Sequence, residues 1–91
     1  MVVSRRYLLR GRVQRVGFRF FAQDAARREG VRGLVRNLPD GRVEVIAEGE
    51  AEAVFSFEWS IRRGPAGARV DDVETEFLEP SGRFMGFSVT A

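Results

Sequence analysis

Apolar and polar residues alternate along the first part of the chain. The period is two over residues 4–13, which is typical of a β-strand with one buried face. One side of this pattern comprises Tyr7, Leu9, Gly11 and Val13. Similar alternation predicts strands over residues 32–38 and 43–49, and Pro39 and Gly41 are suited to a turn between them.

Two other stretches have the apolar spacing of helices. Residues 18–29 repeat their apolar side chains on one helical face, and Gly30 follows as a C-terminal stop. Its apolar positions are Phe18, Phe21, Ala22, Ala25 and Ala26. Residues 50–63 form a second amphipathic stretch, with acidic residues in the first turn and arginines in the last, both favourable to the helix dipole. Gly64 and Pro65 end this helix.

The C-terminal part predicts two more strands. Alternation with interleaved acidic residues indicates a strand over residues 70–77, and residues 84–89 fit a short last strand. The order βαββαβ plus a final strand predicts an α+β fold of the ferredoxin-like kind, with two helices on one face of an antiparallel sheet. The length of 91 residues and the 44% hydrophobic content suit one core, so we expect residues 1–91 to form a single domain.

The turn between the first strand and the first helix, residues 11–19, is the candidate functional stretch. It places backbone N–H groups and Arg19 at a helix N-terminus, where unpaired amides and the helix dipole favour an anion. These residues therefore predict a small phosphate-binding loop. A split βαβ connection would bring residues 14–19 close to a strand that could carry Asn37.

Composition limits the chemistry that this loop can use. The sequence has no cysteine and no histidine, so a disulfide, a thiolate metal site, a cysteine nucleophile and the usual general base are excluded. No apolar run approaches the roughly 20 residues of a membrane span. The N-terminus also lacks a hydrophobic signal region. We therefore expect a cytoplasmic protein with no membrane partner.

Charge is distributed unevenly along the chain. Residues 1–42 contain 11 arginines and three acidic residues, a net charge of +8, whereas residues 43–91 contain four arginines and 10 acidic residues, a net charge of −6. The basic half is compatible with nucleic acid or with a positive field around a small anionic substrate. It is also compatible with purely structural pairing, in which Arg10 and Arg12 meet Glu74 and Glu76 across the sheet.

The stretch Gly11-Arg12-Val13-Gln14-Arg15-Val16-Gly17-Phe18-Arg19 resembles the acylphosphatase signature Gly-x-Val-Gln-Gly-Val-x-Phe-Arg. The resemblance continues through Val35-Arg36-Asn37-Leu38-Pro39-Asp40-Gly41 and through Gly64-Pro65, so it covers nearly the whole chain. It implies the ferredoxin-like fold and an enzyme that hydrolyses small acyl phosphates to a carboxylate and inorganic phosphate. It also implies that no metal or cofactor is needed, and that inorganic phosphate binds as product or inhibitor. We expect a monomer.

The resemblance also implies roles for particular residues. Arg19 is the phosphate-binding arginine, because its planar guanidinium can hold two phosphoryl oxygens, and Asn37 orients the attacking water. The predicted phosphate-binding loop comprises Gln14, Arg15, Val16, Gly17, Phe18 and Arg19, with backbone N–H groups around the phosphate. The structural alternatives are a surface role for Arg19, a turn role for Asn37 and Gly17, and a core role for Phe18.

Arg15 departs from the signature, which has glycine there. If that position has a positive φ, arginine carries a conformational cost of about 1 kcal/mol or more and could reshape the loop. If φ is negative, Arg15 fits and can add a second positive charge near the phosphate. A non-catalytic relative of the enzyme is therefore one alternative function.

A nucleic-acid-binding domain of the same fold is the other alternative. Residues 83–89 have a faint similarity to an RNP1 motif, but a second RNP-like segment is missing. We therefore expect no nucleic-acid partner. Turnover of an acyl phosphate separates the enzyme from both alternatives.

Overall fold

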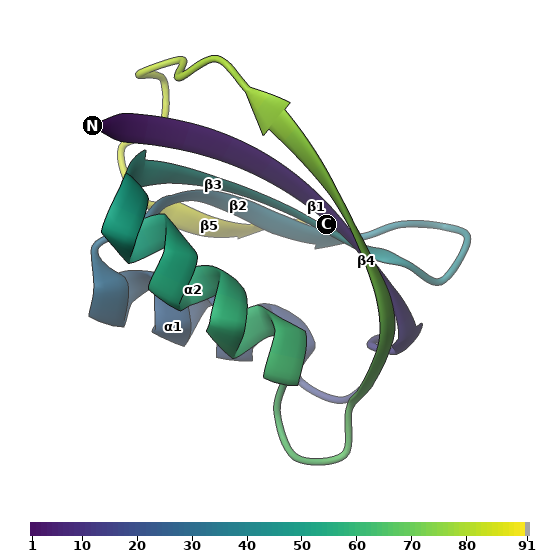
Figure 1. The fold of residues 1–91 in the computed structure, drawn as a ribbon. Helices are drawn as coiled ribbons and strands as arrows, with labels where there is room; N and C mark the ends of the chain where they lie inside the picture. The colour runs from purple at the N-terminus through teal and green to yellow at the C-terminus, as the bar shows by residue number, and fades with distance from the viewer. Residues whose placement is uncertain (91) are drawn as a thin grey trace.

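A computed structural model describes residues 1–90 of the chain. Its elements are β1 (Val2–Arg12), α1 (Phe18–Glu29), β2 (Arg32–Asn37), β3 (Val43–Glu50), α2 (Ala51–Arg63), β4 (Arg69–Leu78) and β5 (Phe87–Thr90). Both helices lie on one face of a five-stranded sheet, and the other face is open (Figure 1). The predicted α+β sandwich is therefore confirmed.

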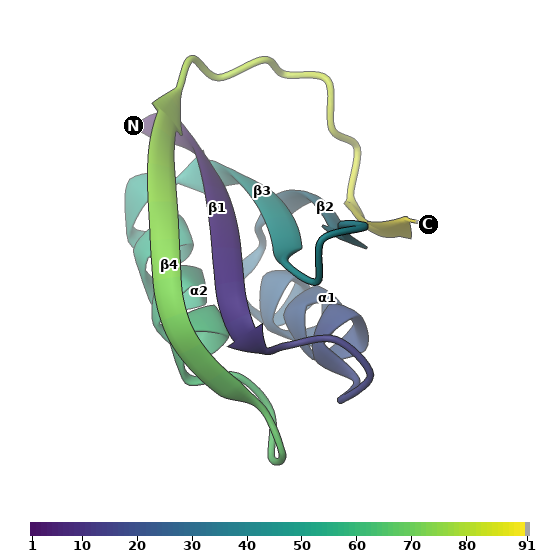
Figure 2. The ribbon, with the colours of Figure 1, turned by 90° about the vertical axis from the view of Figure 1, so that its right-hand side faces the viewer.

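The sheet has the strand order β4-β1-β3-β2-β5. Strand β1 pairs antiparallel with β3 and β4, and β2 pairs antiparallel with β3, but β5 runs parallel to β2. The sheet is thus mixed, and the expectation of a wholly antiparallel sheet was wrong at this edge. The reason is the segment after β4, which passes over one end of the sheet to the opposite edge before β5 begins (Figure 2).

The last strand is also shorter than the sequence indicates. It begins at Phe87 rather than at Phe84, because the backbone before it forms a turn instead of pairing along its length. Phe87 is buried and packs against Phe57, with ring centroids 5.6 Å apart. The RNP1-like segment therefore directs the ring of Phe87 into the core, where it is not available to stack on a base.

The core lies between the sheet and the two helices. Tyr7, Leu9 and Val13 of the first alternating stretch are fully buried, as their period predicts. The helices contribute Phe18, Ala22, Ala25, Ala26, Val54, Phe57 and Ile61. No helix in residues 1–90 is both long and apolar enough to cross a membrane.

Acidic and basic side chains do pair across the open face, but not in the expected register. Arg10 lies opposite Asp72, because the antiparallel register of β1 and β4 places Leu8 opposite Glu74, and a bulge after Arg10 then places Arg12 opposite Arg69. The structure instead pairs Arg6 with Glu44 (2.6 Å) and Glu76 (3.3 Å).

Glu44 lies at the centre of these ion pairs, because its carboxylate binds both Arg6 and Arg36. Burial alone would raise the pKa of its carboxyl group, but hydrogen bonds from Arg36 and Arg6 hold that pKa below the usual value. Glu44 is consequently a charged structural residue in the middle of the sheet.

Glu48 fastens the segment that crosses between the two edges. Its side chain is only 1% exposed and accepts hydrogen bonds from the backbone N–H groups of Ser81 (2.9 Å) and Gly82 (2.7 Å). The Ser81 hydroxyl adds a third (3.1 Å). The backbone N–H of Ser81 is the leading cause that lowers the pKa of Glu48. This carboxylate therefore guides the chain toward β5.

Candidate active site

The loop between β1 and α1 is held by two residues in the left-handed region. Arg15 has a φ of 64° and Gly17 a φ of 75°, and Gly17 is the N-cap of α1. No side chain caps this helix end, and its first backbone hydrogen bond runs from the N–H of Phe21 to the carbonyl of Gly17 (3.0 Å). The amides of the first turn consequently keep donors that an anion can accept.

A small cavity, here called the loop pocket, opens at this helix end. Its volume is about 140 Å³, and its lining residues are Val13, Arg15, Gly17, Phe18, Arg19, Phe20 and Asn37. Five of the predicted site residues thus meet in one place, even though Asn37 comes from the end of β2. Gln14 and Val16 are not part of the lining. Phe18 is 1% exposed and anchors the start of α1 in the core, so it also has the structural role expected for it.

Gln14 has a role that the sequence did not predict for its side chain. Its Nε2 donates to the carbonyl oxygens of Leu38 (2.8 Å) and Arg42 (2.9 Å) in the turn between β2 and β3. The same two residues close that turn, because the N–H of Leu38 donates to the carbonyl of Arg42 (2.8 Å). Gln14 therefore ties the loop to the segment that carries Asn37. The sequence contained one indication of this role, because the amide of a glutamine side chain has two N–H donors that can bind two carbonyl oxygens at once.

Arg19 is positioned by the last strand. It is the second residue of α1, it is partly buried, and its Nη1 donates to the carbonyl oxygen of Thr90 in β5 (3.2 Å). A guanidinium has five N–H donors, so this one contact leaves others for a ligand. None of the ion pairs within residues 1–90 includes Arg19. The arrangement suits bidentate binding of a phosphoryl group.

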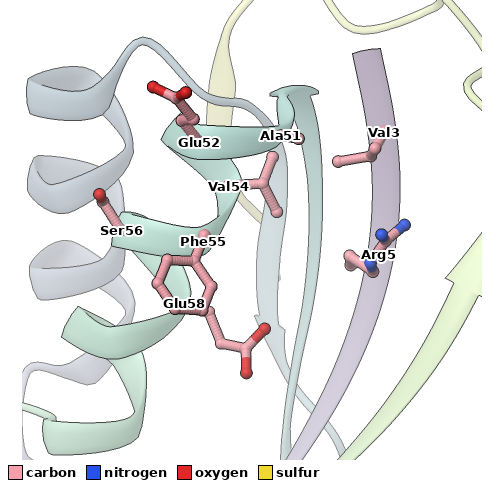
Figure 3. A pocket seen from close by; sticks show the side chains of 8 residues that line it. All are labelled: Val3, Arg5, Ala51, Glu52, Val54, Phe55, Ser56 and Glu58. Carbon is pink, nitrogen blue, oxygen red and sulfur yellow. The ribbon is translucent and has the colours of Figure 1, made fainter. Parts of the chain in front are cut away.

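A second, larger cavity lies between α2 and β1 and is here called the side hollow (Figure 3). Its volume is about 450 Å³, and its lining residues are Val3, Arg5, Ala51, Glu52, Val54, Phe55, Ser56 and Glu58. Two of its charged side chains have protein partners. Arg5 donates to the carbonyl oxygen of Ser4 (2.9 Å) and lies 4.1 Å from the ring centroid of Phe77.

Glu58 is engaged in the same way. It accepts hydrogen bonds from the hydroxyl of Tyr7 (3.0 Å) and from Nε of Arg62 (2.8 Å). Burial, together with the charge of Glu58, raises the pKa of Tyr7, so the phenol stays protonated over the neutral range. Within the described part of the chain, no three His, Cys, Asp or Glu side chains gather into a metal-binding cluster.

Comparison with known proteins shows similarity to acylphosphatases. The family model described as Acylphosphatase matches residues 5–89. An acylphosphatase of Anaeromyxobacter dehalogenans is 49% identical over 87 residues, which cover 96% of this chain and 94% of that protein. One from Thermus thermophilus is 50% identical over 82 residues, covering 90% and 92% of the two chains. The crystal structure of acylphosphatase from Bacillus subtilis superposes with a TM-score of 0.94 at 35% identity and covers both chains completely.

Proposed function

The chain belongs to the acylphosphatase family of enzymes, and on this premise we propose that it hydrolyses the carboxyl-phosphate bond of small acyl phosphates in the loop pocket. The products are a carboxylate and inorganic phosphate. The observation that carries the proposal is the meeting of Arg15, Gly17, Phe18, Arg19 and Asn37 around one cavity.

The phosphoryl group is proposed to bind at the N-terminal end of α1. Backbone N–H groups of Gln14, Arg15, Val16, Gly17 and Phe18 surround the phosphate in this proposal. Arg19 contributes two parallel hydrogen bonds to its oxygens. A volume of about 140 Å³ supports this assignment. At roughly 30 Å³ for each water molecule in the liquid, this is the space of four to five waters, which is enough for a phosphoryl group.

Asn37 is proposed to orient the attacking water. Its amide can accept a hydrogen bond from the water and donate one to a phosphoryl oxygen, which fixes the water in line with the bond that breaks. The water oxygen forms a bond to phosphorus as the bond from phosphorus to the acyl oxygen breaks, and the electron pair leaves with the carboxylate. A carboxylate needs little protonation, so this route requires neither histidine nor cysteine. Stabilisation of the charged phosphoryl oxygens supplies the main rate enhancement.

Hydrolysis of benzoyl phosphate by the purified chain tests this proposal. We expect phosphate release that is competitively inhibited by inorganic phosphate and unchanged by EDTA, in line with a metal-independent mechanism. Phenyl phosphate is the matched control substrate, because phenolate is a poorer leaving group than benzoate and the proposed site has no general acid. We expect negligible phosphate release from it. Failure to hydrolyse benzoyl phosphate would refute the proposal.

The positive φ of Arg15 favours one competing function, a non-catalytic relative that binds phosphate without turnover. Such a protein would bind inorganic phosphate with an intact loop and leave benzoyl phosphate unhydrolysed. Location in the cytoplasm, the monomeric state and the absence of nucleic-acid partners stay predictions.

A further inference from the structure

We propose that Arg15 is a specificity-determining residue that favours acyl phosphates with a second anionic group, such as a carboxylate or a further phosphate, on the acyl side. This inference rests on the proposed function, because it assigns a role to the part of the substrate that the phosphoryl site does not hold.

The size of the loop pocket leaves the acyl group outside it. Pockets that enclose a small organic ligand measure about 300–1,000 Å³, and this one measures about 140 Å³. Once a phosphoryl group occupies the space beside Arg19, the remainder of the substrate must extend past the mouth of the pocket. The residues at the mouth therefore decide which acyl groups are accepted.

Burial distinguishes the floor of the pocket from its mouth. Val13 and Phe18 are 0% and 1% exposed and form the floor, whereas Arg15 and Phe20 are exposed, Phe20 by 61%. The mouth thus combines one cation with one aromatic ring. Phe20 can contact any acyl group, but Arg15 is the residue that discriminates between charged and uncharged ones.

The charge of Arg15 is not neutralised by the protein around it. None of the ion pairs formed by residues 1–90 includes it, whereas Arg6, Arg36 and Arg42 are paired with carboxylates. Arg19 is assigned to the phosphoryl group. A second anionic group on the substrate consequently meets an unpaired guanidinium at the mouth.

The backbone supplies an independent argument. Arg15 is the single non-glycine residue in the described range with a positive φ, at 64°. Glycine would adopt this conformation without the steric cost, and the signature that this stretch resembles has glycine there. Strain of this kind persists at functional sites when the side chain has a use there. The preference for a charged acyl group provides such a use.

Two substrates with the same carbon backbone, one with a charged and one with an uncharged end, test the inference. Succinyl phosphate carries a free carboxylate, and its monomethyl ester has the same chain without that charge. The measured quantity is the ratio of kcat/KM for succinyl phosphate to kcat/KM for the ester at about 0.15 M ionic strength. We expect this ratio to fall about fivefold in Arg15→Gln, the upper range for a solvent-exposed ion pair. In Arg15→Lys it should be largely retained.

Arg28→Gln is the matched control for loss of one positive charge. Arg28 is an exposed arginine nine positions beyond Arg19 on α1, which corresponds to about 14 Å along the helix. That separation exceeds the screening length of about 8 Å at this salt concentration, so the ratio should stay within about 1.5-fold. Arg15→Gly removes the charge and the strain together. If Arg15→Gln folds poorly, the same fall in Arg15→Gly supports the inference.

The two proposals fail in distinguishable ways. If the wild-type chain hydrolyses both substrates and the ratio is the same in the wild type, Arg15→Gln and Arg15→Gly, the role of Arg15 is refuted and the proposed function stands. If the wild-type chain hydrolyses neither substrate, the proposed function fails, and the inference fails with it.

Discussion

The loop pocket and the side hollow differ in both size and chemistry, and the smaller of the two has the features of a catalytic site. The side hollow is about 450 Å³ and the loop pocket about 140 Å³. In the larger cavity Arg5 and Glu58 are already engaged by Ser4, Phe77, Tyr7 and Arg62. In the smaller one, an uncapped helix end and Arg19 retain donors for a ligand.

The comparison shows that available hydrogen-bond donors identify this site better than cavity volume does. A transition state with charge on phosphoryl oxygens is stabilised by preorganised donors, whereas the carboxylates of Glu52 and Glu58 in the side hollow would repel that charge. The difference follows from the fold, because the loop pocket lies where a helix N-terminus and the end of a strand meet.

The largest expected effect comes from two matched arginine substitutions. Arg19→Ala should lower kcat/KM for benzoyl phosphate by about 10³-fold and abolish binding of inorganic phosphate, because the phosphoryl oxygens lose their bidentate donor. Arg5→Ala in the side hollow should leave kcat/KM within about twofold. Steady-state kinetics with benzoyl phosphate measure kcat/KM for both variants. A comparable loss in Arg5→Ala would break the distinction between the two cavities.

Asn37→Ala should have the next largest effect, and it separates two roles within the loop pocket. We expect kcat to fall about 10²-fold, since the water loses its orientation, while the inhibition constant of inorganic phosphate changes by less than about threefold. Product inhibition measured alongside turnover gives both values. Equal losses in turnover and in phosphate binding would show that Asn37 holds the phosphate instead.

Gln14→Leu tests whether the loop must be tied to the turn after β2. The carbonyl oxygens of Leu38 and Arg42 each lose one of two donors, while the N–H groups of Gly41 and Leu38 remain, and the loss of two hydrogen bonds should lower the free energy of unfolding by about 1–3 kcal/mol. We also expect kcat to fall about tenfold with the KM nearly unchanged, because Asn37 shifts relative to the bound phosphate. Urea unfolding and kinetics measure the two effects. Lower stability with unchanged kcat would make Gln14 a structural residue alone.

The smallest effect is expected from relief of strain at the mouth of the loop pocket. Arg15→Gly should raise the free energy of unfolding by about 1 kcal/mol, because glycine adopts a φ of 64° without a steric penalty. For a chain of this length, that gain corresponds to a rise in Tm of about 4–8 °C. Differential scanning calorimetry measures it. An unchanged or lower Tm would show that the loop holds Arg15 without strain.

The sequence was sufficient to predict the elements and to propose where the site lies. Period-two and helical spacing gave five strands and two helices close to their observed bounds, and the contiguous motif over residues 11–19 indicated the loop. Asn37 could be associated with that loop because the split βαβ connection limits which strands are neighbours.

Features that depend on pairing between distant segments could not be predicted. The antiparallel register of β1 and β4 decides which arginines meet acidic residues, and the bulge after Arg10 places Arg12 opposite Arg69. An alternating pattern contains no information about that register. The parallel direction of β5 follows from the passage of the preceding segment, which Glu48 binds, to the opposite edge of the sheet. The sequence also left the sign of φ at Arg15 open, because arginine permits either region at different cost.

The contact between Arg19 and Thr90 can form only late in the folding of the chain. It joins residues 71 positions apart, and β1 pairs with β3 and β4, neither of which follows it directly in sequence. Folds dominated by such distant pairings form slowly, because the chain loses the entropy of loop closure before the stabilising contacts are made. On a ribosome adding about 5–20 residues per second, the arginine emerges roughly 4–14 s before its strand partner. Arg19 therefore reaches its observed orientation only at the end of folding, when the last strand has joined the sheet.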